Sequence, residues 1–150
     1  MRVTLQRVSE ASVVINQKAK SNIQLGLVVL LGISPEDSID DIEWLCNKIC
    51  KLRIFADRQG KMNLSIEDIK GELLLISQFT LFASTKKGNR PSYIQSAAPH
   101  IALPLYNEFI LCIEKKLNKP ISTGEFGADM KVHLVNDGPV TINIDSKNKE

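Results

Sequence analysis

The chain has 150 residues, of which 43% are hydrophobic, and its 19 basic and 17 acidic residues give a net charge of +2. This size suits a single domain over residues 1–150, with a polar tail that we expect to be frayed from about Ser146. The small net charge excludes a strongly basic nucleic-acid coat protein but allows a local basic patch. Because no apolar run approaches the roughly 18 residues of a membrane span and the first residues resemble no signal peptide, we expect a cytoplasmic protein without membrane contact.

Three strands are predicted in the first part of the chain. Residues 2–8 alternate polar and apolar, which is typical of a half-buried strand. Residues 11–15 are predicted to form a second strand and residues 16–20 a polar turn. Residues 27–33 read Leu-Val-Val-Leu-Leu-Gly-Ile, and this continuous apolar run predicts a central strand that is buried on both faces.

A helix is predicted to follow, with Ser38 as its N-cap and Asp41 three residues later as the partner of a capping box. Trp44 is expected to cover the edge of the core. The apolar stripe of this helix recurs at helical spacing and consists of Ile42, Leu45, Cys46, Ile49 and Leu52.

The middle of the chain is predicted to hold short strands and one buried strand. Residues 53–56 are predicted to form a short strand, residues 57–60 a turn, and residues 62–64 a strand that pairs back. The next strand is predicted from Gly71 to Leu81, starting with the apolar run 73–76. After this run the sequence becomes polar. Polar side chains at the end of a buried strand are held in fixed positions, which suits a binding or catalytic site.

A polar, basic loop is predicted over residues 83–93, followed by a second helix over residues 99–117. Its expected apolar stripe is Ile101, Leu105, Phe109, Cys112, Ile113 and Leu117. Pro104 is expected either to kink this helix or to mark its start. Three final strands are predicted at residues 121–126, 130–135 and 140–145.

Many strands, two helices and no βαβ alternation predict an α+β fold. We expect a mostly antiparallel, β-barrel-like sheet with two main helices. The alternating pattern Val-Thr-Ile-Asn-Ile at residues 140–144 indicates a terminal strand that can present its edge to a second copy of the chain.

No conventional catalytic set is present in the sequence. His100 and His133 belong to no triad or metal motif, and neither a phosphate loop nor a nucleophile elbow occurs. The thiols of Cys46, Cys50 and Cys112 are expected to be buried structural groups, because free cysteine is commonly buried. We therefore expect neither a metal nor a cofactor.

Hydroxyl and amide groups are the chemistry that remains. Gln78 and Thr80 are two residues apart and would share a face of an extended chain. Thr80 is a candidate donor to a developing oxyanion, and Gln78 can hold a substrate hydroxyl. The alternative is that the strand becomes polar only because it emerges into solvent.

Gly138-Pro139 is either an ordinary tight turn or, if cis, a pair of fixed carbonyls that can test the stereochemistry of a ligand.

Two segments, Ser77-Gln-Phe-Thr-Leu81 and Asn136-Asp-Gly-Pro-Val-Thr141, resemble the two signature motifs of the D-aminoacyl-tRNA deacylase family. The resemblance extends over nearly the whole chain. Residue Tyr93 stands where a Phe is common, and Pro104 is a departure that concerns packing. Further matching segments, in order, are Gln6-Arg7-Val8, Arg53-Ile-Phe, Gly60-Lys-Met-Asn63, Arg90-Pro-Ser-Tyr and Phe126-Gly-Ala-Asp-Met130.

This resemblance implies a homodimer with two active sites at its interface. Such enzymes hydrolyse the ester between a D-amino acid and the 3′-terminal adenosine of tRNA, and many also clear glycine. Ser77 to Thr80, including Phe79, would line the pocket for the adenosine and the ester. Gly138-Pro139 would be cis and would reach into the partner's pocket, where its carbonyls capture the amino group and exclude an L side chain.

The resemblance also implies supporting roles. Arg7 would orient the Gly138-Pro139 motif, and Phe126 and Met130 would lie near the pocket. The 2′-hydroxyl of the tRNA would assist catalysis while main-chain amides and Thr80 stabilise the oxyanion. A nucleophilic Thr80 is disfavoured because no base is evident beside it.

The basic loop offers Lys86, Lys87 and Arg90 as phosphate contacts, although an ordinary solvated loop has the same composition. Two other functions are compatible with parts of the sequence. A non-catalytic RNA- or ribosome-binding β module would use the polar strand end and this loop equally well. A small-molecule esterase is disfavoured by the missing nucleophile-base pair.

Overall fold

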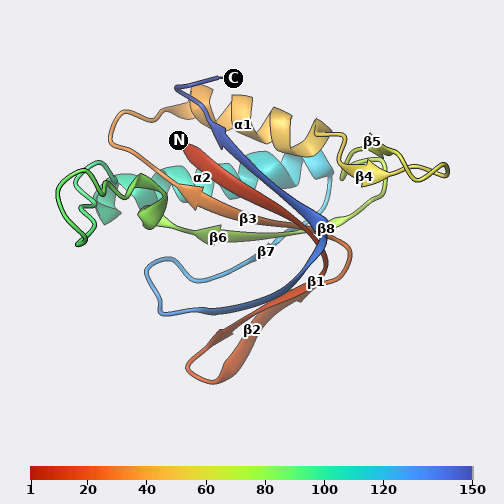
Figure 1. Cartoon of the computed structure of the whole chain (residues 1–150), viewed down its shortest axis with the longest axis horizontal. Coiled ribbons are helices and arrows are strands. Elements are labelled where there is room, and N and C mark those ends of the chain that lie inside the picture. The colour runs from red at the N-terminus through yellow and green to blue at the C-terminus, as the bar shows by residue number, and fades with distance from the viewer. Residues whose placement is uncertain (150) are drawn as a thin grey trace.

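The computed structural model describes residues 1–149 of the chain, and it consists of one large twisted sheet with two helices packed on it (Figure 1). In chain order the elements are β1 (Arg2–Ile15), β2 (Lys18–Ile23), β3 (Gly26–Gly32), α1 (Ile39–Lys51), β4 (Phe55–Ala56), β5 (Met62–Leu64), β6 (Glu72–Ser77), the 3₁₀ turn η1 (Phe79–Phe82), α2 (Pro99–Leu117), β7 (Ser122–Thr123) and β8 (Lys131–Asp145).

The sheet is organised around β1. Its strand order is β2-β1-β3-β6-β7, and β8 also pairs with β1, whereas β4 and β5 form a separate two-stranded ribbon. The pairings of β1 with β2, β3 and β8 are antiparallel. The predicted α+β fold with a mostly antiparallel, barrel-like sheet and two main helices is confirmed.

The expectation of no βαβ alternation is wrong. Strand β6 runs parallel to β3 and is reached through α1, and β7 runs parallel to β6 and is reached through α2. Neighbouring parallel strands need such crossover connections. The first βαβ unit, β3-α1-β6, is hard to recognise in the sequence because the β4-β5 ribbon is inserted between α1 and β6.

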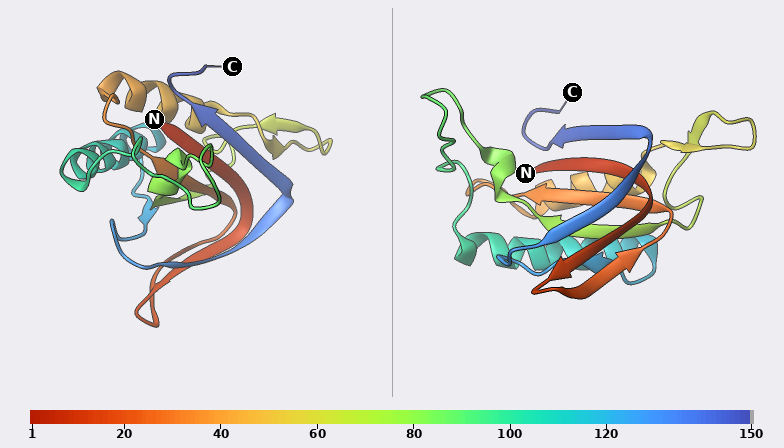
Figure 2. Two further views of the ribbon diagram at one scale, coloured as in Figure 1. Left: turned by 60° about the vertical axis from the view of Figure 1, so that its left-hand side comes forward. Right: turned by 60° about the horizontal axis from the view of Figure 1, so that its bottom comes forward.

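Several predicted strands merge or shift in the structure. The two strands predicted at residues 2–8 and 11–15 are one strand, β1, and β2 begins at Lys18, inside the predicted turn. Only Asn16 and Gln17 have positive φ there, so the turn needs two residues. The last two predicted strands are likewise one long strand, β8, which bends sharply partway along (Figure 2).

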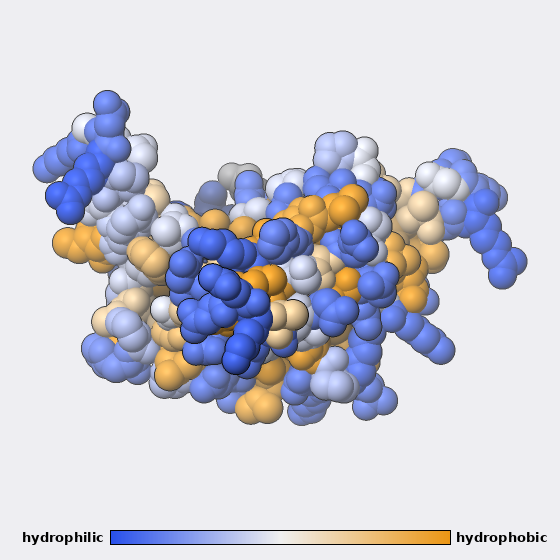
Figure 3. All heavy atoms as spheres, turned by 90° about the horizontal axis from the view of Figure 1, so that it is seen from below, coloured by the Kyte–Doolittle hydropathy of each residue, from blue (hydrophilic) through white to orange (hydrophobic). Residues whose placement is uncertain are grey.

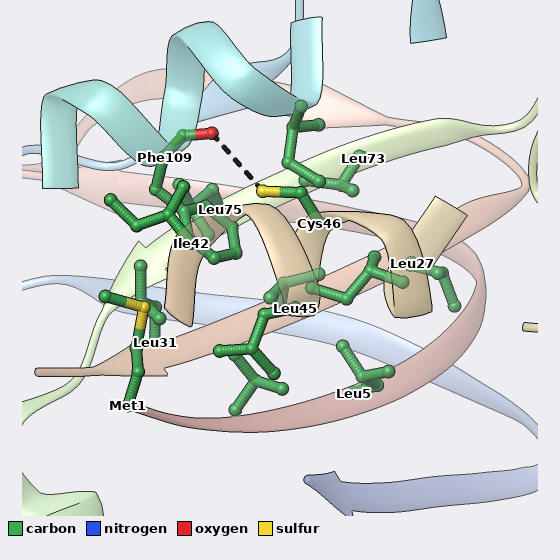
Figure 4. Close-up of a cluster of buried hydrophobic side chains, with 14 of the residues drawn as sticks. Met1, Leu5, Leu27, Leu31, Ile42, Leu45, Cys46, Leu73, Leu75 and Phe109 are labelled. Carbon is green, nitrogen blue, oxygen red and sulfur yellow. Dashed lines mark hydrogen bonds between the residues drawn. The ribbon is translucent and has the colours of Figure 1, made fainter. Parts of the chain in front are cut away.

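Helix α1 begins as predicted. The backbone N–H of Ser38 donates to the Asp41 carboxylate over 2.8 Å, which is one half of a capping box. Its apolar stripe packs on β3 and β6 and contacts α2, where the Cys46 thiol lies 4.0 Å from the Phe109 carbonyl that accepts its hydrogen bond (Figure 4). Burial raises the pKa of the Cys50 thiol to about 12 and raises that of Cys46 further. Both are buried as predicted, and Cys112 is partly buried.

The bounds predicted for α2 are those observed, and its predicted apolar stripe is confirmed except at Ile101, since Leu105, Phe109, Cys112, Ile113 and Leu117 are buried or pack against the core. The side chains that reach the core are Ala102, Tyr106, Phe109 and Ile113. Ile101 is 36% exposed because it lies one position before the stripe that faces the sheet. Pro104 lies inside the helix, which begins at Pro99.

The chain beyond β8 is anchored at its first residues, so the expectation of fraying from Ser146 is wrong. Ser146 is only 3% exposed, and its hydroxyl accepts a hydrogen bond from the Met1 amino group over 2.9 Å. Lys147 Nζ lies 2.7 Å from the Asp41 carboxylate. Burial would raise the pKa of Asp41, but hydrogen bonds from Lys147, Ser146 and the Ser38 backbone outweigh it and lower the pKa.

Among the helices of the described residues, none has both the length and the apolar character needed to cross a membrane.

Candidate functional site

A pocket of about 560 Å³ opens at the carboxyl end of β6. Strand β6 is buried from Leu73 to Ile76 and ends at Ser77, whose neighbour on β3 is Leu31. The N–H of Gln78 donates to the Leu31 carbonyl over 2.7 Å, and the chain then turns into η1 instead of continuing as a strand. The predicted strand from Gly71 to Leu81 is therefore four residues too long at its carboxyl end.

The amide of Gln78 and the hydroxyl of Thr80 contact each other directly. Gln78 Nε2 donates to Thr80 Oγ1. The sequence placed these two side chains on one face of an extended strand, but the 3₁₀ turn is what brings them together. Gly32 allows this turn to lie close to β3, since a Cβ there would be 3.0 Å from Leu81 Cβ and 3.1 Å from the Gln78 carbonyl.

Aromatic and sulfur-containing side chains form the walls of the pocket. Phe79 is 56% exposed and meets Tyr93 edge-to-face, with ring centroids 5.0 Å apart. On the opposite wall Phe126 contacts Tyr106 with centroids 5.6 Å apart, and Met130 lies nearby. The structure thus brings Ser77, Gln78, Phe79, Phe126 and Met130 to one pocket. Thr80 does not line this pocket and is connected to it by its hydrogen bond with Gln78.

Sequence reasoning missed the side of the pocket that is formed by the first turn of α2 and the residues just before it. Ser96, Ala97, Pro99 and Ala102 line it. The Ala97 N–H donates to the Ile33 carbonyl over 2.9 Å, which fixes this segment against the end of β3. Small residues before a helix carry no chemical signal, so only the folded chain shows that they border the pocket.

The second motif lies on β8, exposed to solvent, and its Gly138-Pro139 peptide bond is cis. The Arg7 side chain holds it, because its Nε donates to the Asp137 carbonyl over 3.2 Å while its Nη1 donates to the Ile54 carbonyl over 2.5 Å. The amide of Asn136 closes the loop by donating to the Val140 carbonyl over 3.0 Å.

The two motifs are not brought together within one chain. At the start of β1 the Arg2 guanidinium reaches the Leu81 carbonyl over 3.1 Å, and near the middle of the same strand Arg7 reaches Asp137. Arg7 follows Arg2 by five positions along the strand, which corresponds to about 16 Å. The Gly138-Pro139 segment therefore lies beside the middle of β1, whereas the Ser77–Thr80 segment lies beside its start.

The basic loop projects from the pocket end of the molecule. Lys86, Lys87 and Arg90 are all exposed, and the loop is closed at its base by two backbone hydrogen bonds between Ser84 and Ser92 of 2.8 and 2.9 Å. It forms a hydrophilic projection at one side of the space-filling view (Figure 3).

The pocket is lined by apolar and uncharged polar side chains. His100 and His133 are exposed and do not line it. Within residues 1–149 no group of three or more His, Cys, Asp or Glu side chains is placed to hold a metal ion. The chemistry that this pocket offers is hydrogen bonding from hydroxyl, amide and backbone groups.

Comparison with known proteins gives consistent matches. The family model described as D-Tyr-tRNA(Tyr) deacylase matches residues 4–145. Proteins named D-aminoacyl-tRNA deacylase from Flavobacterium psychrophilum and Bacteroides fragilis are 59% and 61% identical over 150 residues, covering all of both chains.

Two solved structures share the fold. One, named c-Myc DNA Unwinding Element Binding Protein, is 41% identical with a TM-score of 0.92 and covers 97% of this chain and 98% of its own. The other, described as a probable eukaryotic D-amino acid tRNA deacylase, has a TM-score of 0.81 at 18% identity over 95% of this chain and 97% of its own. At that identity, the second similarity concerns the fold alone.

Proposed function

Because the chain belongs to the D-Tyr-tRNA(Tyr) deacylase family, we propose that it hydrolyses the ester that joins a D-amino acid to the 3′-terminal adenosine of tRNA. The observation that carries this proposal is the pocket at the end of β6, where Gln78 and Thr80 are bonded to each other beside apolar walls. A pocket of this size and lining suits a nucleoside with an attached amino acid.

Thr80 is proposed to stabilise the oxyanion. Its oxygen accepts the hydrogen bond of Gln78, so its own O–H is available to donate to a second acceptor. An aminoacyl ester is already activated and needs positioning more than a strong nucleophile. We assign the activation of water to the neighbouring 2′-hydroxyl of the tRNA, because the pocket lining contains no histidine, carboxylate or lysine that would activate Thr80.

The active form is proposed to be a homodimer. In one chain the Gly138 segment lies beside Arg7 near the middle of β1 and Thr80 lies near Arg2 at its start, so a two-fold axis between these two positions would bring each Gly138 to the partner's Thr80. The surface between them suits burial because it is polar but uncharged. Thr4 Oγ1 contacts Asn143 Oδ1 over 2.6 Å there, so part of its hydrogen bonding is already satisfied within the chain.

Gly138 and Pro139 are proposed to select the substrate in the partner's pocket. Their carbonyls belong to a segment held by Arg7 and Asn136, so they form a fixed wall and not a flexible lid. A D-aminoacyl group would place its amino group on this wall, whereas an L side chain would collide with it. Glycine has no side chain to reject, so glycyl-tRNA should also be hydrolysed.

Phosphate contacts are assigned to Lys86, Lys87 and Arg90, which are exposed on the loop that leads away from the pocket. One solved relative is named as a DNA-binding protein, which favours a non-catalytic nucleic-acid-binding module as the second candidate function. That function would leave the hydrogen bond between Gln78, which lines the pocket, and Thr80 without a purpose.

The test is amino-acid release from D-tyrosyl-tRNA, L-tyrosyl-tRNA and glycyl-tRNA, with D-tyrosyl-tRNA ending in 2′-deoxyadenosine alongside. Release of D-tyrosine and glycine with L-tyrosine retained supports the editing function, and loss of activity on the deoxy substrate supports the role of the 2′-hydroxyl. Equal and negligible release from the first three substrates would leave the binding module as the better account.

A further inference from the structure

The ribbon formed by β4 and β5 projects from the end of the molecule that carries Gly138. It leaves the body of the protein on the opposite side from the basic loop (Figure 1), and its surface is hydrophilic (Figure 3). Arg58 and Lys61 are both exposed near its tip. Among the ion pairs of the described residues neither side chain has a carboxylate partner.

The tip of the ribbon is an ordered turn. The Asp57 carboxylate accepts the N–H groups of Gln59 over 2.8 Å and Lys61 over 3.0 Å, and the Asp57 N–H donates to the Lys61 carbonyl over 2.8 Å. These backbone hydrogen bonds lower the pKa of Asp57, so its carboxylate stays ionised and remains bonded to the backbone of the turn. The two cations are therefore held on a rigid support, facing solvent.

The base of the ribbon is tied to the Gly138 segment by a single side chain. Arg7 donates through Nη1 to the carbonyl of Ile54, the residue before β4, and through Nε to the carbonyl of Asp137. Arg7 itself is only 12% exposed. The ribbon and the substrate-selecting wall thus form one rigid unit.

We propose that Arg58 and Lys61 bind the phosphate backbone of the tRNA whose aminoacyl end occupies the partner subunit's pocket. The inference rests on the proposed function, because the homodimer places each Gly138 segment at the opposite pocket. The ribbon then stands on one side of that pocket and the basic loop of the protomer that owns the pocket stands on the other. A tRNA end entering between them meets cations on both sides.

The first experiment removes the two charges and measures the salt dependence of tRNA binding. Arg58→Ala with Lys61→Ala should weaken binding of deacylated tRNA roughly tenfold at moderate salt and reduce the slope of log affinity against log salt by about 1 for each cation lost. The matched control is Lys18→Ala with Lys20→Ala, which removes the same charge from the exposed tip of the β1-β2 hairpin. The control should keep the wild-type slope.

The second experiment asks which pocket the ribbon serves, using mixed dimers in which Thr80→Ala inactivates one protomer. When the same protomer carries Thr80→Ala and the ribbon variant, the surviving pocket belongs to the wild-type protomer and faces the altered ribbon. When the two changes are on different protomers, the surviving pocket faces an intact ribbon. We expect kcat/KM for D-tyrosyl-tRNA to fall about tenfold in the first dimer only.

A fall in the second dimer and not in the first would overturn the assignment to the partner's pocket, and an unchanged salt slope in the double variant would overturn the phosphate contact. Hydrolysis of D-tyrosyl-adenosine, which lacks the rest of the tRNA, should be equal in all dimers with one active pocket. If the wild-type protein hydrolyses neither D-tyrosyl-tRNA nor D-tyrosyl-adenosine, the proposed function is wrong, and the role proposed for the ribbon is wrong with it.

Discussion

Gln78 and Thr80, the two polar side chains at the end of β6, form a donor–acceptor pair in which the Gln78 amide donates to the Thr80 hydroxyl oxygen. This pairing fixes the rotation of the hydroxyl and directs its proton away from Gln78. Two uncharged side chains thereby offer one oriented donor, and no ionisable group is needed to hold it in place.

Replacing Thr80 tests this orientation. Thr80→Ala removes the donor and should reduce kcat for D-tyrosyl-tRNA by about 10²–10³ while leaving KM nearly unchanged, as expected for a group that acts mainly on the transition state. Thr80→Ser retains the hydroxyl and should keep most of the activity. Both are checked by steady-state deacylation, and a trapped acyl-enzyme on Thr80 would contradict the oxyanion role.

Gly138→Ala should impair activity more than it impairs folding. A Cβ at Gly138 would lie 2.6 Å from Arg7 Nη2, and its φ of +118° disfavours any L side chain. The segment is exposed, so the free energy of unfolding should fall by only about 1–3 kcal/mol. Gly88→Ala is the matched control, because Gly88 also has a positive φ (+75°) but has nothing within 4 Å of the added Cβ. Activity is compared on D-tyrosyl-adenosine, which lacks the tRNA phosphates assigned to the loop of Gly88, and a comparable loss in both variants would show that the contact with Arg7 is irrelevant.

Gly32→Ala should reduce deacylase activity by displacing the 3₁₀ turn η1, which packs against Gly32. The added Cβ would press on Leu81 Cβ at 3.0 Å and on the Gln78 carbonyl at 3.1 Å, so η1 must move away from β3. A displacement of Thr80, the proposed oxyanion donor, by a fraction of an ångström should lower kcat by roughly 10-fold or more. Thermal unfolding measured alongside separates this effect from instability, and wild-type kcat with a reduced melting temperature would contradict it.

Asp41 should link stability to acid pH. Its pKa is lowered in the folded protein, so its contribution to stability is complete above its unfolded pKa of about 3.9 and is lost as pH falls below that value through its folded pKa. Asp41→Asn should cost about 1–2 kcal/mol at pH 7, since it removes both the contact with Lys147 and the N-cap partner of Ser38. Urea unfolding from pH 7 to pH 3 should show the difference between wild type and variant shrinking, and a constant difference would contradict the linkage.

Local signals in the sequence predicted much of the fold. The capping pair Ser38 and Asp41 located the start of α1, and Pro99 located the start of α2. Both are properties of a few adjacent residues, which explains why they are readable from sequence. The breaks predicted around Ser9 and Asp137 were wrong because β1 and β8 each continue through these residues, although the register between the two strands shifts there. The predicted interruptions thus correspond to irregular pairing and not to strand ends.

Several residues of the candidate site could be predicted from the sequence, but their arrangement in space could not. The polar residues that follow Ile76 were identified, since a buried apolar run that ends in Ser, Gln and Thr is an unusual pattern. The 3₁₀ turn and the wall near Ala97 were not, because both depend on backbone contacts with β3. The distance between Thr80 and Gly138 along β1 is likewise a tertiary property.

The pairing of β1 with β8 also sets an order of events during synthesis. Arg2 lies opposite Asp145, so the first strand to leave the ribosome must wait for the last before its outer edge is closed. Strands β2, β3 and β6 can assemble on the nascent chain earlier, whereas Phe126, Met130 and Gly138 come from its final part. An unfinished chain therefore lacks both a pocket wall and the segment proposed to select the substrate, and we expect it not to bind an aminoacyl-tRNA while it is still being made.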